Sequence, residues 1–238
     1  MKRILFITDN IMIYKNIKSY LEDNNLSSNV DFKCSSDTSP LSNILSIISV
    51  KNDLGLILKQ YKLVFSAHCI QFFPKILTEN VKCINIHPGY NPINRGWYPQ
   101  VFSIIHNLPI GATIHEMDSK LDNGPIIVRE LVPKFAYDTS HSLYNRILEA
   151  ELKLFREWYL KILNNDYVVF SPEKEYNYFS KSDFSELCEL DLDEKLTMSE
   201  FLNKLRALTH GSYNNAFFID SDSGRKVYLS INFKLADK

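Results

Sequence analysis

The sequence has few glycines, and the first of its seven is Gly55. The turn after the first apolar segment, residues 3–8, therefore contains none. The dinucleotide-binding fingerprint needs glycines at that turn so that the backbone can approach a pyrophosphate, and the P-loop motif occurs nowhere in the sequence. Nicotinamide-dependent dehydrogenases and P-loop kinases are excluded on this ground.

An excess of charge of one sign is also lacking. The 27 Lys and Arg residues nearly balance the 28 Asp and Glu residues, for a formal net charge of −1. Proteins that bind nucleic acid usually carry a basic surface excess, because they neutralise phosphates. We therefore expect no nucleic-acid partner.

Long apolar runs and patterned cysteines are missing too. No segment reaches the roughly 18–20 apolar residues of a membrane span, and the N-terminal segment meets polar residues at Thr8, too soon for a signal peptide. The four cysteines show no C-x-x-C spacing, so neither a metal site nor a disulfide framework is indicated. We expect a reduced, soluble, cytoplasmic protein without a membrane partner.

What the sequence does contain is an alternation of short buried segments with segments of helical spacing over residues 1–110. Strands are predicted at 3–8, 30–36, 62–67, 81–87, 111–118 and 124–131. Helices are predicted after Asn10, at 42–50, 75–80 and 99–107, and from a cap near Thr139 to Leu163. This pattern predicts an α/β fold: a Rossmann-like, mostly parallel twisted sheet flanked by helices.

The last third of the chain has a different composition. Residues 1–165 form the predicted main domain, 166–195 a polar, turn-rich connecting segment, and 196–238 a small α+β subdomain. The subdomain is predicted to contain a helix at 199–208 and a hairpin turning at Ser223-Gly224. It is too small to hold its own core, so we expect it to dock on the main domain or to form a homodimer.

The stretch INIHPG ends the fourth predicted strand with two polar side chains. Residues i and i+2 of a strand project from the same face, so Asn85 and His87 point together and away from Ile84 and Ile86. Pro88 ends the strand and leaves His87 at its carboxyl end, where open α/β sheets bind ligands. An imidazole beside an amide can offer a proton acceptor and a hydrogen-bond donor to a reacting carbonyl.

A catalytic histidine usually needs a third group that sets its tautomer or its pKa. Asp118 and Asp122 are the candidates, in the loop HEMDSKLDNGP between the last two predicted strands. The glycine of Asn123-Gly124 allows that loop to turn sharply, which brings a carboxylate back toward His87.

INIHPGYNPINRG followed by GATIHEMDSKLDNGPII resembles the folate-dependent formyltransferase family, in layout over residues 1–165 and in motif over 81–130. Asn85, His87 and Asp122 fall on the family's catalytic positions. The resemblance implies attack by a substrate amine on the formyl group of 10-formyltetrahydrofolate, through a tetrahedral oxyanion. Asn85 and protonated His87 would stabilise that oxyanion, and Asp122 would orient His87. Whether His87 or Asp122 takes the proton stays open.

The resemblance also assigns the ligand-binding loops. The loop 66–74 would grip the pterin largely by its backbone, and the loop 117–122 would close over the other side of the ring. The predicted folate-binding residues are Ile70, Gln71, Met117, Asp118, Lys120 and Asp122. Arg95 would pair with a diphosphate oxygen, and Trp97, Tyr98 or Tyr213 would stack on a thymine ring. The full predicted substrate-binding set is Tyr90, Asn94, Arg95, Trp97, Tyr98 and Tyr213.

The loop 87–104 and the tail look like those of sugar N-formyltransferases acting on dTDP-linked 4-amino-4,6-dideoxyhexoses. The resemblance implies dTDP-4-amino-4,6-dideoxyglucose as substrate, for bacterial O-antigen or another surface polysaccharide. Open alternatives are a 3-amino or galacto isomer, a hydrolase of formyltetrahydrofolate, and a non-catalytic sugar-nucleotide binder. A metal-dependent deacylase using His87, His115 and Asp118 is an alternative of another class.

Overall fold

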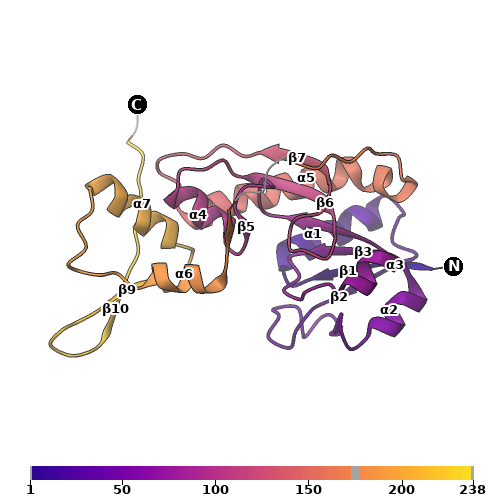
Figure 1. Cartoon of the computed structure of the whole chain (residues 1–238), viewed down its shortest axis with the longest axis horizontal. Helices are drawn as coiled ribbons and strands as arrows, with labels where there is room; N and C mark the ends of the chain where they lie inside the picture. Colours follow the sequence, from indigo (N-terminus) through magenta and orange to yellow (C-terminus); the bar gives the residue numbers. More distant parts are fainter. Residues whose placement is uncertain (1, 173–176, 237–238) are drawn as a thin grey trace.

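The computed structural model describes residues 2–172 and 177–236, and its centre is a six-stranded sheet (Figure 1). The strand order is β2-β1-β3-β4-β6-β7, with β2, β1, β3 and β4 parallel and β6 and β7 antiparallel to their neighbours. The strands are β1 (Arg3–Thr8), β2 (Val30–Lys33), β3 (Tyr61–Ala67), β4 (Lys82–His87), β6 (Gly111–Glu116) and β7 (Ile126–Leu131). The predicted mostly parallel α/β sheet is confirmed.

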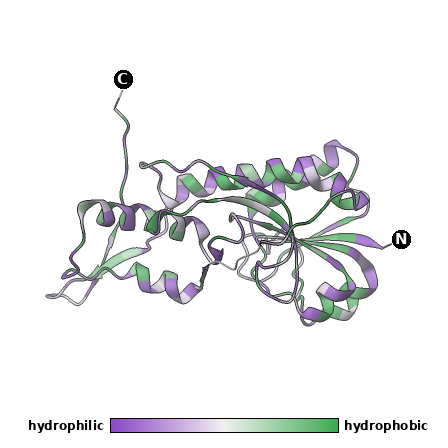
Figure 2. Cartoon of the chain, turned by 45° about the horizontal axis from the view of Figure 1, so that its top comes forward, coloured by the Kyte–Doolittle hydropathy of each residue, from purple (hydrophilic) through white to green (hydrophobic). Residues whose placement is uncertain are grey.

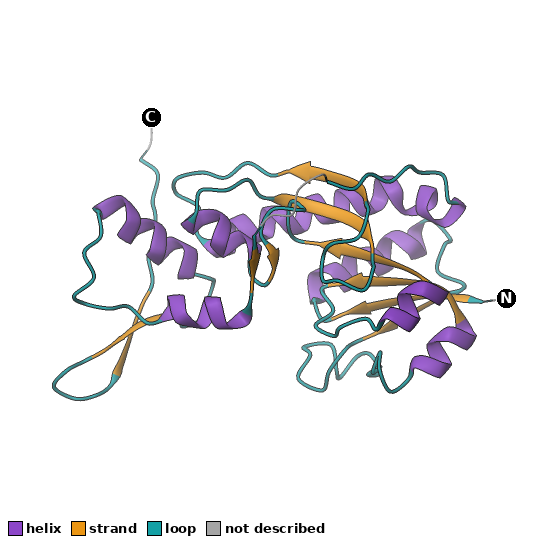
Figure 3. Ribbon diagram, in the orientation of Figure 1, coloured by secondary structure: helices purple, strands orange, loops and turns teal. Residues whose placement is uncertain are grey.

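Helices cover both faces of this sheet (Figure 3). α1 (Ile11–Asp23) and the long α5 (Ser140–Asn164) pack on one face, and α2 (Leu54–Gln60) and α3 (Lys75–Asn80) on the other. Alternate residues of each strand pack into the two hydrophobic cores, one on each face of the sheet. Phe6, Phe65 and Ile84 face α5, whereas Leu5 and Val64 face α2 and α3. Figure 2 shows the corresponding hydrophobic stripe on α5.

A smaller module follows α5 in the chain and lies at the opposite end of the molecule from the N-terminus (Figure 1). Its elements are β8 (Tyr178–Phe179), α6 (Lys181–Cys188), α7 (Met198–Leu208), β9 (Ala216–Ile219) and β10 (Lys226–Leu229). The module packs on α4 (Pro99–Ile105), and β8 pairs with the short β5 (Arg95–Gly96). The predicted helix and hairpin of the tail are both present.

Residues 42–50 are the one predicted helix that does not form. Their backbone groups form hydrogen bonds with residues outside the segment instead: Cys34 N donates to Ser46 O, and Ile48 N donates to Cys34 O. The side chain of Gln71 accepts from Val50 N and donates to Ile48 O. These long-range bonds replace the i to i−4 bonds that helical spacing alone suggested, because local propensity is a weak prior.

The predicted connecting segment 166–195 is more ordered than its polar composition indicated. It contains β8 and α6, and α6 contributes Cys188 to a small core with Leu205, Leu208 and Ala216. Residues 173–176 of this segment lie outside the described part of the chain. Within the described part, no helix is both long and apolar enough to span a membrane.

Candidate active site

Asn85, His87 and Asp122 come together at the carboxyl end of β4. The Asn85 Nδ2 donates to Asp122 Oδ1 at 3.0 Å, and His87 Nδ1 lies 3.6 Å from the same oxygen. His87 and Asp122 are buried, with 5% and 9% of their surfaces exposed. The predicted convergence of the three side chains is confirmed, and their catalytic roles remain predictions.

Asp122 reaches β4 because its loop folds back on itself. A Cβ at Gly124 would lie 1.9 Å from Glu116 O, so only glycine permits this close return of the chain. The neighbouring loop then fixes the carboxylate: Gly96 N donates to Asp122 Oδ2 at 3.1 Å, and Asn91 Nδ2 donates to Asp122 O at 3.0 Å. The turn predicted from Asn123-Gly124 therefore positions the carboxylate as expected.

His115 is the site residue whose role the sequence analysis missed, since it was considered only as a metal ligand. In the antiparallel pairing of β4 and β6 it lies directly opposite Asn85. Its Nδ1 donates to Glu116 O at 2.7 Å, so its Nε2 is the acceptor that receives an Asn85 N–H at 3.2 Å. Both amide hydrogens of Asn85 are thus directed, one to His115 and one to Asp122.

Burial decides the charge of His87. Desolvation lowers its pKa, and the nearby His115 and His68 act in the same direction, whereas the Asp122 carboxylate opposes the shift. A neutral imidazole is favoured, which differs from the protonated form that the family resemblance implied. His87 Nε2 is buried and has no hydrogen-bond partner among the described residues.

A cavity adjoins this cluster. Its lining combines flat and apolar side chains with polar ones, namely Gln71, Phe72, Phe73, His115, Met117, Asp118, Lys120, Leu121 and Asp122. Such a lining fits a planar heteroaromatic ring with polar edges, as a pterin has. Five of the six predicted folate-binding residues line it.

The sixth, Ile70, is 49% exposed and does not line the cavity. The Gln71 side chain is engaged in holding residues 35–50, so any contact it makes with a ligand would come from its backbone.

Three of the predicted substrate-binding residues lie in the loop that follows β4 and contact other protein groups. Tyr90 stacks on Arg129, whose guanidinium carbon lies 4.3 Å from the ring centroid. Asn94 is fully buried and bonds Ser103 Oγ and Asn177. A substrate contact by Asn94 stays a prediction. Arg95 is 9% exposed and donates to Asn123 Oδ1, which ties the two site loops together. A diphosphate contact by Arg95 stays a prediction.

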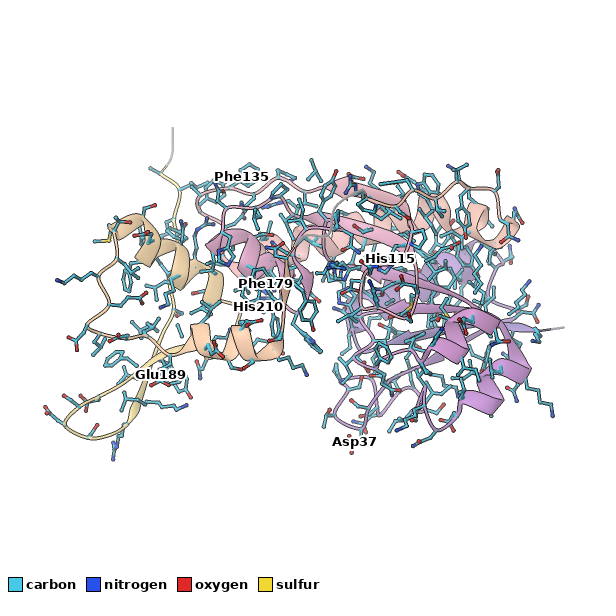
Figure 4. The ribbon with its side chains drawn as sticks, viewed as in Figure 1. Asp37, His115, Phe135, Phe179, Glu189 and His210 are labelled. Atoms are coloured by element: carbon cyan, nitrogen blue, oxygen red, sulfur yellow. The ribbon has the colours of Figure 1, made fainter. Side chains whose placement is uncertain are left out.

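The three predicted stacking residues lie where the main domain meets the C-terminal module. Trp97 is half-buried beneath Lys181, whose Nζ lies 3.9 Å from its ring. Tyr98 packs on Phe184 of α6, with centroids 4.2 Å apart, and Tyr213 is 70% exposed. Figure 4 labels His115 on the main domain and His210 in the C-terminal module.

The metal-site alternative finds no support in the geometry. Across the described residues, no group of three His, Cys, Asp or Glu side chains is arranged to hold a metal. Asp118 Oδ1 accepts from Lys120 N, and both His87 and His115 approach Asp122 rather than Asp118.

The comparison with known proteins agrees with this arrangement. The family model described as "Formyl transferase" matches residues 47–158, and "N-formyltransferase dimerization C-terminal domain" matches 183–235. A dTDP-4-amino-4,6-dideoxyglucose formyltransferase of Mycobacterium tuberculosis is 47% identical over 175 residues, which cover 74% of each chain.

Two solved structures match nearly the whole chain. A sugar N-formyltransferase from Shewanella sp FDAARGOS_354 has a TM-score of 0.94 at 39% identity, with 100% of both chains covered. A 4-N formyltransferase from Francisella tularensis has a TM-score of 0.91 at 40% identity, with 99% of both chains covered. The likeness therefore extends over the main domain and the C-terminal module together.

Proposed function

The chain belongs to the formyltransferase family, and from this premise we propose that it transfers a formyl group from 10-formyltetrahydrofolate to a dTDP-linked amino sugar. The proposed acceptor is the 4-amine of dTDP-4-amino-4,6-dideoxyglucose, the substrate named for the 47% identical relative. The observation that carries the proposal is the Asn85, His87 and Asp122 cluster beside a cavity lined by aromatic, apolar and polar side chains.

His87 is the proposed proton carrier. Its Nδ1 faces Asp122 and its Nε2 faces no protein partner among the described residues, so a neutral ring can accept a proton there. As the amine nitrogen bonds to the formyl carbon, Nε2 takes the amine proton. The proton then passes to N10 of the folate as the bond between N10 and the formyl carbon breaks. Atoms and charge balance without a metal or a redox partner.

Asp122 and Asn85 support this transfer. The Asp122 carboxylate, 3.6 Å from Nδ1, favours the Nδ1–H tautomer by its charge and stabilises the imidazolium that forms transiently. One N–H of the Asn85 amide donates to His115, which fixes the orientation of the amide. The other N–H donates to Asp122 in this structure, and a developing oxyanion would compete with Asp122 for that N–H.

The experiment is to incubate the protein with 10-formyltetrahydrofolate and each candidate acceptor separately. We expect the sugar nucleotide to gain the mass of one formyl group with dTDP-4-amino-4,6-dideoxyglucose. Formylation of only the galacto epimer or the 3-amino isomer would overturn the substrate assignment. Release of free formate without any formylated sugar would favour the hydrolase.

The proposal includes a homodimer formed through the C-terminal module. That module exposes large apolar side chains, among them Leu192, Met198, Val227 and Tyr228. Light scattering coupled to gel filtration tests the homodimer, and a monomer at micromolar concentration would contradict it.

The proposal also includes a cytoplasmic location, in keeping with four free cysteines. A role in surface polysaccharide synthesis completes it.

A further inference from the structure

A partly buried chain of hydrogen bonds connects three elements at the carboxyl end of the sheet. His68 follows β3, Asn10 follows β1, and Tyr144 and Glu151 project from α5. His68 Nε2 lies 2.8 Å from Glu151 Oε2, and Tyr144 Oη lies 3.0 Å from His68 Nδ1. Asn10 Nδ2 donates to Tyr144 Oη at 3.2 Å.

The amide N–H of Asn10 donates to Tyr144 Oη. In the Nε2–H tautomer of His68, the Tyr144 hydroxyl donates to His68 Nδ1 and the Nε2–H donates to Glu151 Oε2. Glu151 is 0% exposed, and this burial raises the pKa of its carboxyl group. Both ring nitrogens of His68 are engaged, so its side chain has none left to bind a ligand. These hydrogen bonds therefore fix the orientation of the His68 ring.

The backbone at His68 explains why holding is needed. Its φ is +63°, a left-handed conformation that is uncommon outside glycine and carries a steric cost. His68 opens the segment 68–74, defined here as the cavity loop, which supplies Gln71, Phe72 and Phe73 to the cavity wall. The Gln71 side chain anchors the middle of this loop to residues 35–50. His68 provides the corresponding anchor at its beginning.

We propose that Glu151, Tyr144 and His68 form a positioning network that holds the cavity loop in the conformation that binds reduced folate. The inference rests on the proposed function, since it takes the cavity as the folate site. Neither Glu151 nor Tyr144 lines the cavity, and both act through His68. Tyr144 is fixed further by the ring of His210 in the C-terminal module, 5.4 Å away between centroids.

The test is the affinity for folinic acid, a stable reduced folate, measured by isothermal titration calorimetry on the full chain. Tyr144→Phe removes one hydroxyl and keeps the ring, so it breaks the link to His68 without opening a cavity. We expect the Kd to rise about fivefold to tenfold, the scale of one lost hydrogen bond. Glu151→Leu should weaken binding at least as much, and Glu151→Gln, which keeps an acceptor for Nε2–H, should restore most of the affinity.

The matched control is Tyr159→Phe on the same helix. Tyr159 is fully buried, and its hydroxyl has no hydrogen-bond partner among the described residues. We expect an unchanged Kd for folinic acid. In steady state, Tyr144→Phe should raise KM for 10-formyltetrahydrofolate while kcat and KM for the sugar nucleotide stay within about twofold.

The outcomes separate the two proposals. Wild-type protein that does not bind folinic acid would overturn the proposed function, and this inference with it. Wild-type protein that binds while Tyr144→Phe and Glu151→Leu bind equally well would overturn the network alone. A variant that melts at lower temperature yet keeps its Kd would show that the network serves stability only, which also contradicts the inference.

Discussion

The ring of His87 fills the space that a side chain at position 89 would occupy. A Cβ built on Gly89 would lie 2.4 Å from His87 Nε2 and 2.7 Å from its Cδ2. The nitrogen proposed to carry the proton is thus the atom that any larger residue at position 89 would displace. The glycine after Pro88 serves close packing against the catalytic ring, because its φ is not in the left-handed region.

We therefore predict that Gly89→Ala lowers kcat about 100-fold or more. The added methyl group must displace the imidazole from its position, and a misplacement of about 1 Å at a reacting group has an effect of that size. Steady-state kinetics measures it. Gly55→Ala is the matched control, since a Cβ there meets nothing within 4 Å and lies in α2, where alanine is preferred. Equal activity of the two variants would show that the His87 position is not critical.

A second prediction concerns His115, which directs the amide of Asn85. His115→Leu removes the acceptor at Nε2, so the Asn85 amide loses one of the two bonds that orient it and keeps its bond to Asp122. The loss of one such hydrogen bond corresponds to about 1 kcal/mol, and we expect kcat to fall about fivefold to tenfold. His115→Gln, which keeps a side-chain acceptor, should recover part of this loss. An unchanged kcat for His115→Leu would remove His115 from the site.

A third prediction follows from His210, whose burial lowers its pKa to about 4. The unfolded chain binds a proton near pH 6.5, whereas the folded chain does not bind it until about pH 4. The contribution of neutral His210 to the free energy of unfolding is therefore fully present above pH 6.5, and it is lost as the pH falls from 6.5 toward 4. Urea unfolding at several pH values should show this slope.

The variant His210→Gln checks the assignment. Without a titrating group at position 210, the number of protons taken up on unfolding near pH 5 should fall by about one. A residual slope is expected, because burial also lowers the pKa values of His87 and His115. A slope identical to that of the wild type would contradict the prediction.

Much of the site could be predicted because its geometry is local in the sequence. Asn85 and His87 lie on the same face of a strand because side chains alternate between the two faces. Asn123-Gly124 predicts the turn that brings Asp122 back toward His87. His115 was within reach of the same argument: antiparallel pairing of 81–87 with 111–116 puts it opposite Asn85.

The parts that failed depend on long-range partners. The sequence of 42–50 predicts a helix, and only the bonds from Cys34 and Gln71 show why no helix forms. The network through His68 joins residues up to 141 positions apart, between Asn10 and Glu151, so no spacing in the sequence indicates it.

The last prediction tests the approach to the site, using the two tryptophans of the chain. Trp97 lies under Lys181 and Trp158 lies under Lys161, with Nζ 3.9 Å and 4.0 Å from the respective rings. Both are half-buried, so each is a control for the other. If Trp97 stacks on the thymine ring, dTDP should quench the fluorescence of Trp158→Phe, in which Trp97 is the sole tryptophan, and leave that of Trp97→Phe unchanged. Trp97→Ala should then raise KM for the sugar nucleotide about tenfold, since base stacking contributes about 1–3 kcal/mol. Quenching of Trp158 instead would place the nucleotide on α5, away from the loop that carries His87.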